Sequence, residues 1–208
     1  GDLLTEGFHI DVVQASIALT LPPQNVPVAT NGYLFSFNGT DQMKKCDGAS
    51  WAAHTGATKG YYGAYFDSRL WCVDEQYADV LNFSTKSPGD HPLDFVTANT
   101  VVNVSAPGTI TFRAGSGTKI TGMITFKNQL YVFLKDAIFR LTPAGGTDAN
   151  AFTVQLVTNA IGCVSFRSIC QVGEDIFFAA DDGIYSLGDV ANYTEVRTTN
   201  KSARIQGT

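Results

Sequence analysis

The sequence predicts an all-β protein of about four repeated, four-stranded antiparallel units, arranged like the blades of a β-propeller. The first observation is composition: Thr, Val and Ile together number 50 of 208 residues, whereas Glu occurs only four times. β-branched residues favour strands, and helix surfaces favour Glu, Lys and Ala. The second observation is an internal repeat of short strand patterns, which is typical of propellers and related arrays.

One strand pattern recurs four times. Each copy alternates apolar and polar residues at its end, as a half-buried strand does. Aligned on Leu34, Val80, Ile138 and Ile184, the copies are spaced 46, 58 and 46 residues apart. The copies are Tyr33–Phe37, Val80–Phe83, Ala137–Leu141 and Gly183–Leu187.

A second pattern precedes three of these copies. An apolar residue is followed by three polar or glycine residues, and an aliphatic–aromatic pair comes next. The pairs are Leu70-Trp71, Leu130-Tyr131 and Ile176-Phe177. The polar residues between are typical of hairpin turns. A further β-rich stretch follows each unit, at Leu93–Ser105, Phe152–Thr158 and Tyr193–Thr199.

Four strands in each unit of this length are the pattern of a propeller blade. One sheet cannot bury both of its faces, so neighbouring sheets stack around an axis. We expect a single propeller domain or fragment, with repeat units at about residues 8–57, 58–117, 118–159 and 160–205. Propellers have roughly four to eight blades, so the chain is either a complete small propeller or part of a larger one. An antiparallel sandwich is the alternative fold.

The repeated strands also predict the structural core. Their apolar side chains should pack between neighbouring sheets. They are Phe35, Phe37, Leu70, Trp71, Phe83, Leu130, Tyr131, Ile138, Phe139, Ile176, Phe177, Ile184 and Tyr185. Asp182-Gly183 is expected to form a hairpin turn. Tight backbone positions are expected at Gly63, Gly122 and Gly183.

No motif points to catalysis. The stretch Gly115–Lys119 lacks the Gly directly before Lys that a phosphate loop requires, and it is interpreted as a linker. His9, His54 and His91 lie in separate regions, and no Gly-x-Ser-x-Gly motif is present. Asp181-Asp182 lacks the further ligands of a calcium loop. We therefore expect no catalytic, cofactor-binding or metal-binding residues, and a protein that is not an enzyme.

The cysteines are expected to be free thiols, because four in 208 residues is far below the density of a disulfide scaffold. They are Cys46, Cys72, Cys163 and Cys170. Five Asn-x-Ser/Thr triplets, the acceptor motif of N-glycosylation, leave a secreted glycoprotein as an alternative interpretation. These triplets begin at Asn38, Asn82, Asn103, Asn192 and Asn200. Four aromatic residues would either stack on sugars or pack between sheets, namely Trp51, Tyr61, Tyr62 and Trp71.

Charge and hydropathy exclude two further classes. The net charge is −5, so the basic footprint of a nucleic-acid-binding domain is absent. No apolar run approaches the roughly 20 residues of a membrane helix, and the longest candidate, Val12–Leu21, contains Gln14 and Ser16. No signal peptide is visible, and the chain begins with Gly1. We expect a piece of a longer polypeptide.

Three groups of segments share a pattern with a known family. They are Gly63–Trp71 with Asp79–Ser84, Gly89-Asp90 and Asp94-Phe95; Lys119–Phe133 with Asp136–Leu141; and Ile161–Ser165 with Ser168-Ile169 and Asp181–Leu187. These segments resemble the propeller strands of the tail nozzle, or tail hub, proteins of short-tailed bacteriophages (the tail tubular protein B-like family). The resemblance covers about residues 28 to 190, and members of this family are usually much longer.

The resemblance implies a structural virion protein without enzymatic activity or cofactor, located in the tail and assembled in the host cytoplasm. In that family, hexameric rings form the distal part of the DNA-conducting tail. The implied partners are other tail proteins, on the adaptor or portal side and among the fibres. Genomic DNA would pass transiently without specific binding, and no membrane span is implied. An acidic pI of about 5.0 suits a conduit that does not hold DNA.

Two other functions stay open from the sequence. One is an extracellular or surface β-propeller module that recognises a glycan or a protein, favoured by the Asn-x-Ser/Thr triplets and the even number of cysteines. The other is a hydrolase on a propeller scaffold, which would use Asp carboxylates gathered at the mouth of the central channel.

Overall fold

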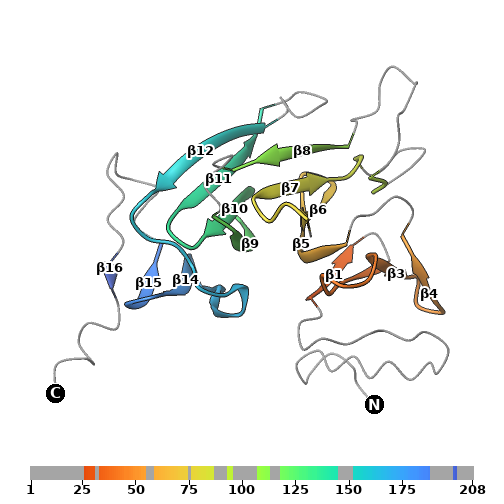
Figure 1. Cartoon of the computed structure of the whole chain (residues 1–208), viewed down its shortest axis with the longest axis horizontal. Helices are drawn as coiled ribbons and strands as arrows, with labels where there is room; N and C mark the ends of the chain where they lie inside the picture. Colours follow the sequence, from red (N-terminus) through yellow and green to blue (C-terminus); the bar gives the residue numbers. More distant parts are fainter. Residues whose placement is uncertain are drawn as a thin grey trace, which may run out of the picture.

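The computed structural model describes residues 26–30, 33–54, 59–74, 76–86, 93–95, 107–112, 118–144, 152–187 and 199–200. These residues form four antiparallel sheets, each built from four strands that are consecutive in the chain (Figure 1). The 3-10 turn η2 (Phe166–Ser168) lies between the third and fourth sheets in chain order. The predicted all-β, propeller-like fold with four four-stranded units is confirmed.

The strands of each sheet follow one another in space as they do in the chain. Sheet A holds β1 (Val26–Thr30), β2 (Tyr33–Phe37), β3 (Lys44–Cys46) and β4 (Trp51–Ala53). Sheet B holds β5 (Gly60–Phe66), β6 (Arg69–Asp74), β7 (Val80–Phe83) and β8 (Gly108–Thr111). Sheet C holds β9 (Ile120–Phe126), β10 (Gln129–Leu134), β11 (Ile138–Pro143) and β12 (Phe152–Thr158). Sheet D holds β13 (Cys170–Val172), β14 (Asp175–Ala180), β15 (Gly183–Ser186) and β16 (Thr199–Asn200).

The fourth strands differ from expectation in sheets B and D. The described part of the stretch Leu93–Ser105 is not a strand, and β8 lies beyond it. In sheet D, β16 is a two-residue strand at the end of the predicted stretch Tyr193–Thr199, whose first six residues lie outside the described residues. The pattern Phe152–Thr158 coincides with β12.

Two-residue turns join the first two strands of sheets B, C and D. Asp67-Ser68 and Lys127-Asn128 have φ between 47° and 58°, the backbone of a type I′ hairpin turn. In sheet D, Gly173 has a φ of 59°. Arg69 is the third of the polar residues between Phe66 and Leu70 that the sequence pattern places in the first turn. It is instead the first residue of β6 and is fully buried.

The sheets follow one another in an arc, in chain order (Figure 1). The first strands of sheets A, B and C lie side by side, because β1 contacts β5 and β5 contacts β9. One hydrophobic cluster lies at each junction between sheets A and B, B and C, and C and D. The molecule is therefore held together by the stacking of sheets, as in a propeller.

The aliphatic–aromatic pairs explain this stacking. In sheet B, Leu70 packs toward sheet A and Trp71 packs toward sheet C. In sheet C, Leu130 packs toward sheet B and Tyr131 toward sheet D. Successive side chains of a strand point to opposite faces, so a sheet covered on both sides needs two adjacent apolar residues.

The register corrects the predicted alignment of the repeat. Strand β2 is the second strand of sheet A, so Leu34-Phe35 is a fourth copy of the aliphatic–aromatic pair and not the counterpart of Ile138 and Ile184. In sheet C, Ile138 pairs with Phe133, and in sheet B, Leu81 pairs with Val73, which is the counterpart of Phe133. The residue of sheet B that corresponds to Ile138 is therefore Leu81 and not Val80.

Ten of the thirteen predicted core side chains are at most 8% exposed. They are Phe35, Phe37, Leu70, Trp71, Phe83, Leu130, Tyr131, Ile138, Ile176 and Tyr185. Phe139 is half-buried and packs against Phe112, with ring centroids 5.0 Å apart. Phe177 is also half-buried.

The core assignment of Ile184 is wrong, because its side chain is 48% exposed. It lies on the side of sheet D that faces away from sheet C, and no further sheet follows among the described residues. Phe177 shares that side, which explains why it is less buried than its counterpart Tyr131.

The glycine predictions have different outcomes. A Cβ at Gly63 would overlap the ring of Phe37, and one at Gly122 would lie 2.9 Å from the Cα of Phe166. Gly63 is thus a position of close approach between sheets A and B, and Gly122 one of close approach between β9 and η2. Gly183 is not part of a turn: it pairs with Ala180 as the first residue of β15, and the turn is Asp181-Asp182. The two-residue loop therefore lies one residue earlier than predicted.

Among the described residues, no helix is long and apolar enough to cross a membrane.

Candidate functional site

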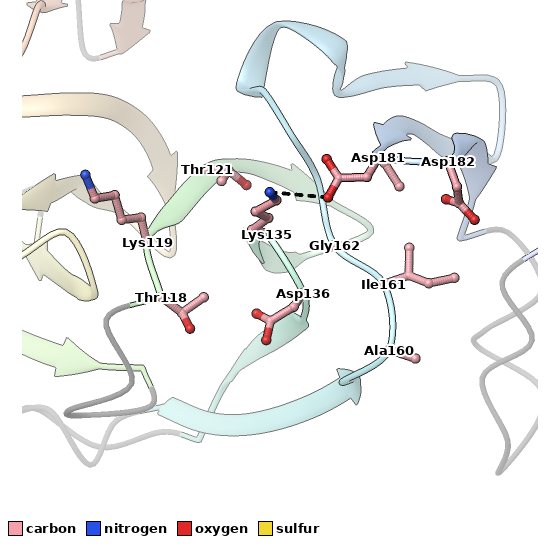
Figure 2. Close-up of a pocket in the computed structure, with 11 residues that line it drawn as sticks. Thr118, Lys119, Thr121, Lys135, Asp136, Ala160, Ile161, Gly162, Asp181 and Asp182 are labelled. Atoms are coloured by element: carbon pink, nitrogen blue, oxygen red, sulfur yellow. Dashed lines mark ion pairs between the residues drawn. The ribbon is translucent and has the colours of Figure 1, made fainter.

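Strand direction brings turns of sheets C and D to the same end of their strands. In an antiparallel sheet of consecutive strands, the start of the first strand, the turn between the second and third strands, and the end of the fourth strand all lie at the same end of the sheet. In sheet C these are Thr118-Lys119, Lys135-Asp136 and Ala160; in sheet D the corresponding turn is Asp181-Asp182. A pocket of about 710 Å³ opens among them (Figure 2). This volume is in the range of small-ligand sites.

A close backbone contact supports one wall of the pocket. Gly162 lies so near the turn after β10 that a Cβ there would overlap the carbonyl oxygen of Leu134. The amide of Cys163 donates to that same oxygen at 2.8 Å, and the amide of Leu134 donates to the Ala137 carbonyl at 2.8 Å. The segment between sheets C and D is thus bound to the β10–β11 turn, and glycine is required at position 162.

The polar lining consists of two lysines, three aspartates and two threonines. Lys135 Nζ lies 3.3 Å from Asp181 Oδ2, which joins the two sheets across the pocket (Figure 2). Both side chains are about two-thirds exposed, so this ion pair contributes under about 1 kcal/mol to stability. Asp182 Oδ2 accepts a hydrogen bond of 2.7 Å from the Tyr185 hydroxyl. The lining offers donors from Lys and Thr and acceptors from carboxylates, which suits a polar ligand or a polar protein segment.

A buried thiol lies next to this wall. Cys163 Sγ is 3.0 Å from the Ser165 carbonyl oxygen and 3.2 Å from Ser168 Oγ. Ser168 Oγ also accepts from the Ala179 amide at 3.1 Å, which ties η2 to β14. Burial raises the pKa of the Cys163 thiol, against the lowering effect of its hydrogen bonds. The neutral thiol is a poor nucleophile.

The structure brings together only part of the residues considered for chemistry. Of the Gly-rich stretch, Thr118 and Lys119 line the pocket, and residues 113–117 lie outside the described residues. His54 is buried directly after β4 and does not line the pocket, whereas His9 and His91 fall outside the described residues. In the described ranges no three His, Cys, Asp or Glu side chains are placed to hold a metal ion.

Two of the Asn-x-Ser/Thr triplets serve the fold. Asn38 Oδ1 accepts from the amides of Thr40 and Asp41, and Asn82 Nδ2 donates to Asp74 at 2.9 Å. Both side chains are at most 7% exposed, which leaves no room for a glycan in the folded protein. The other three triplets lie at positions whose side chains are not described.

Two of the four aromatic residues considered for sugar stacking, Trp71 and Tyr62, pack in the core between sheets B and C. Trp71 is fully buried, and its Nε1 donates to the Phe66 carbonyl at 3.0 Å. Tyr62 packs on Phe166, with ring centroids 4.7 Å apart. Tyr61 is 37% exposed and Trp51 is half-buried.

The four cysteines are free thiols. Cys72 and Cys163 are buried, Cys46 is half-buried and Cys170 is exposed.

Sequence reasoning did not find this pocket. Its lining comes from four separated segments, and only the strand order places them together. The available signal was the pair of polar turns in matching positions, Lys135-Asp136 and Asp181-Asp182, each between the second and third strands of a unit.

Comparisons with known proteins support the fold alone. No family model matches the chain, and no curated protein matches it. The fold is similar to a solved structure of PorZ, described as an essential bacterial surface component of the type-IX secretion system of the human oral-microbiomic Porphyromonas gingivalis. The similarity has a TM-score of 0.50 at 15% identity and covers 84% of this chain and 20% of that chain. The chain therefore spans about a fifth of the length of that relative.

Proposed function

We propose that this chain is a structural, non-enzymatic β-propeller segment of a larger protein assembly, and that the assembly is the tail of a short-tailed bacteriophage. One observation carries the proposal: the segments that resemble the nozzle family coincide with equivalent elements of the repeat. Gly63–Trp71 covers most of β5 and the start of β6, and Lys119–Phe133 covers the equivalent β9 and most of β10. Segments Asp136–Leu141 and Asp181–Leu187 each hold a second turn and most or all of a third strand.

The chemistry of the described residues agrees with a structural role. The buried side chains of Asn38 and Asn82 hold turns, and the half-buried Ser168 ties η2 to β14. In the virion, about six copies would form a ring in the distal tail and bind the adaptor or portal side and the fibres. The genome would pass without specific binding, because a net charge of −5 supplies few phosphate contacts.

The test is the mass of the purified chain by light scattering, alone and with candidate tail adaptor proteins. The proposal expects a ring of about six copies, formed alone or with the adaptor. A persistent monomer with every adaptor would contradict it.

A second candidate is a surface β-propeller module that binds a glycan or a protein. It is supported by the similarity to PorZ, which is itself described as a bacterial surface component, and by the polar pocket between sheets C and D. Binding of soluble glycans or peptides, measured by calorimetry, tests it. Asp136→Asn should weaken such binding, whereas Asp41→Asn, in the loop between β2 and β3 and outside the pocket, should not. Equal binding by both variants would count against this pocket.

A further inference from the structure

Strand β12 forms one edge of sheet C and lies on the outer side of the arc (Figure 1). It has seven residues, whereas the fourth strands of the other sheets, β4, β8 and β16, have three, four and two. An edge strand presents a row of backbone N–H and C=O groups to which another strand can add. Proteins prevent this with short edge strands, charged residues, proline or a bulge. A long edge strand without these features is therefore a candidate docking surface.

The first five residues of β12 lack all of these protections. The strand reads Phe-Thr-Val-Gln-Leu-Val-Thr and contains no charged residue, no proline and no glycine. Its register with β11 is unbroken from Phe152 to Leu156, and the register shift comes after Leu156. The residues from Thr153 to Leu156 are all exposed, and among them Val154 is 42% and Leu156 46% exposed. Short uncharged segments of this composition pair readily with further strands.

The hydrogen bonds of sheet C show which backbone groups of β12 point outward. The amide of Leu134 donates to the Ala137 carbonyl, so these residues form the bonded pair that closes the β10–β11 turn. Bonded and non-bonded pairs alternate along an antiparallel ladder, so Phe139 bonds to β10. Its partner on the other side, Leu156, therefore directs its N–H and C=O away from β11, and Val154, two residues earlier, does the same. In the described part of the chain, β11 is the one strand beside β12.

A second copy of β12 fits this edge. Two copies related by a twofold axis run antiparallel, and an axis at Val154 places Val154 opposite its own copy and Phe152 opposite Leu156 of the other chain. These three residues are two apart in the strand, so all of them turn their backbone groups outward, and each pair exchanges two N–H···O bonds. Twofold symmetry brings identical segments together, so a charged strand would face like charges. The absence of charge from β12 removes this repulsion.

The same pairing continues the apolar surface that joins sheets B and C. Val154 pairs with Leu141 and Leu156 with Phe139, so all four lie on the side of sheet C that faces sheet B. Leu141 is buried there and Phe139 is half-buried, whereas the two residues of β12 are exposed. In the paired form each of them gains an apolar neighbour from the other chain, and such cross-strand pairs stabilise a sheet.

We propose that β12 pairs with β12 of a second copy of this chain, antiparallel and centred on Val154. The four strands of sheet C would then continue into the four strands of its copy. Both chains use the same surface, so the assembly closes at two copies and does not extend into a filament. The proposal is independent of the function proposed above.

Sedimentation velocity over a range of concentrations tests the proposal. We expect wild type to reach twice the 22.3 kDa mass of one chain as the concentration rises. Val154→Lys should weaken this dimer by about tenfold or more, because the twofold axis places the two positive charges opposite each other. The matched control is Val164→Lys, at a residue of similar exposure (41%) that precedes η2 and lies in no strand, and it should leave the dimer intact. Melting curves by circular dichroism confirm that both variants are folded.

Amide hydrogen exchange followed by NMR identifies the contact surface. In the monomer the outward amides of Val154 and Leu156 should exchange fast, whereas that of Gln155, which faces β11, should exchange slowly. Dimerisation should slow the first two by about tenfold or more and leave the third unchanged.

A monomer at all concentrations, equal effects of the two Lys substitutions, or protection of another surface in place of β12 would overturn the proposal. A six-copy ring that Val154→Lys leaves unchanged would overturn this contact while supporting the tail-nozzle function, so the two proposals fail separately.

Discussion

His54 Nε2 lies 2.6 Å from the carbonyl oxygen of Leu93, and this bond joins the end of sheet A to the segment that follows β7. A carbonyl oxygen only accepts, so the proton of the neutral imidazole is on Nε2. The ring is 6% exposed and makes edge contacts with Phe35 and Phe95. Leu93 itself is buried with a φ of 64°, a conformation that a leucine adopts only under constraint.

The first prediction concerns acid. Burial lowers the pKa of His54, and nearby Lys45 lowers it further, against the raising effects of the Leu93 bond and Asp94. Because the folded pKa is below the unfolded value of about 6.5, the unfolded state binds more protons, and stability falls as the pH falls through 6.5. Urea titrations between neutral pH and pH 5 should show this loss in wild type and a smaller one in His54→Gln. Identical pH dependence in the two proteins would contradict the assignment.

The second prediction concerns the junction of sheets B and C. Leu130 is fully buried there, so Leu130→Ala should lower the free energy of unfolding by about 2–5 kcal/mol. Leu156, in the same sheet but 46% exposed, is the matched control, and Leu156→Ala should change stability by less than about 0.5 kcal/mol. Chemical denaturation measures both. A loss below about 0.5 kcal/mol for Leu130→Ala would show that this side chain is not part of the core.

Arg69 supplies a third prediction, because a fully buried guanidinium is costly unless it is bonded. Its Nη1 donates to the Ser84 carbonyl at 2.6 Å, and its Cζ lies 5.0 Å from the Phe83 ring centroid. Burial lowers its pKa to about 10, partly offset by Asp67. Arg69→Ala should cost about 2–4 kcal/mol, from the cavity and the lost bond to Ser84. Arg69→Met, which keeps most of the volume, should cost less in the same denaturation experiment, and the reverse order would refute a packing role.

A fourth prediction tests the backbone contact at the pocket. Gly162→Ala should lower the melting temperature by several degrees, because its Cβ meets the Leu134 carbonyl oxygen and the Lys135 backbone. Gly173→Asn is the control: its surroundings are open, and Asn tolerates the positive φ of this turn. Equal melting temperatures for Gly162→Ala and wild type would show that the segment and the turn are not in contact.

The fifth prediction concerns thiol reactivity. Cys170 is exposed, whereas Cys163 is buried with its pKa raised by that burial. Alkylation by iodoacetamide, followed by peptide mass spectrometry, should modify Cys170 much faster than Cys163 in the folded protein. Urea should make the two rates similar. Equal rates without urea would contradict the buried position of Cys163.

The sequence predicted the stacked sheets but misplaced part of the first unit. Three aliphatic–aromatic pairs were recognised, and the fourth, Leu34-Phe35, was assigned to the wrong strand of its sheet. The cause is β3, a three-residue strand containing Lys44 and Lys45, which shows no apolar alternation. A short polar strand is recognised only when its partner strands are known.

The error at Ile184 has a different cause. Its apolar side chain suits a junction between sheets, but a sequence pattern does not tell whether a further sheet is present to cover it. The pocket was missed for a related reason, since Lys135, Gly162 and Asp181 come together only through the strand order of two sheets. Local sequence patterns identify the strands, whereas the packing of distant segments determines which sheet faces are covered and which turns line a pocket.

The location of the protein tests the central claim most directly. Gold-labelled antibodies against this chain would be applied to intact phage particles and to cells from the culture that expresses it, and viewed by electron microscopy. The account predicts label at the distal end of the tail and none on the cell surface. Label on the cell surface, with unlabelled particles, would contradict the tail-nozzle function.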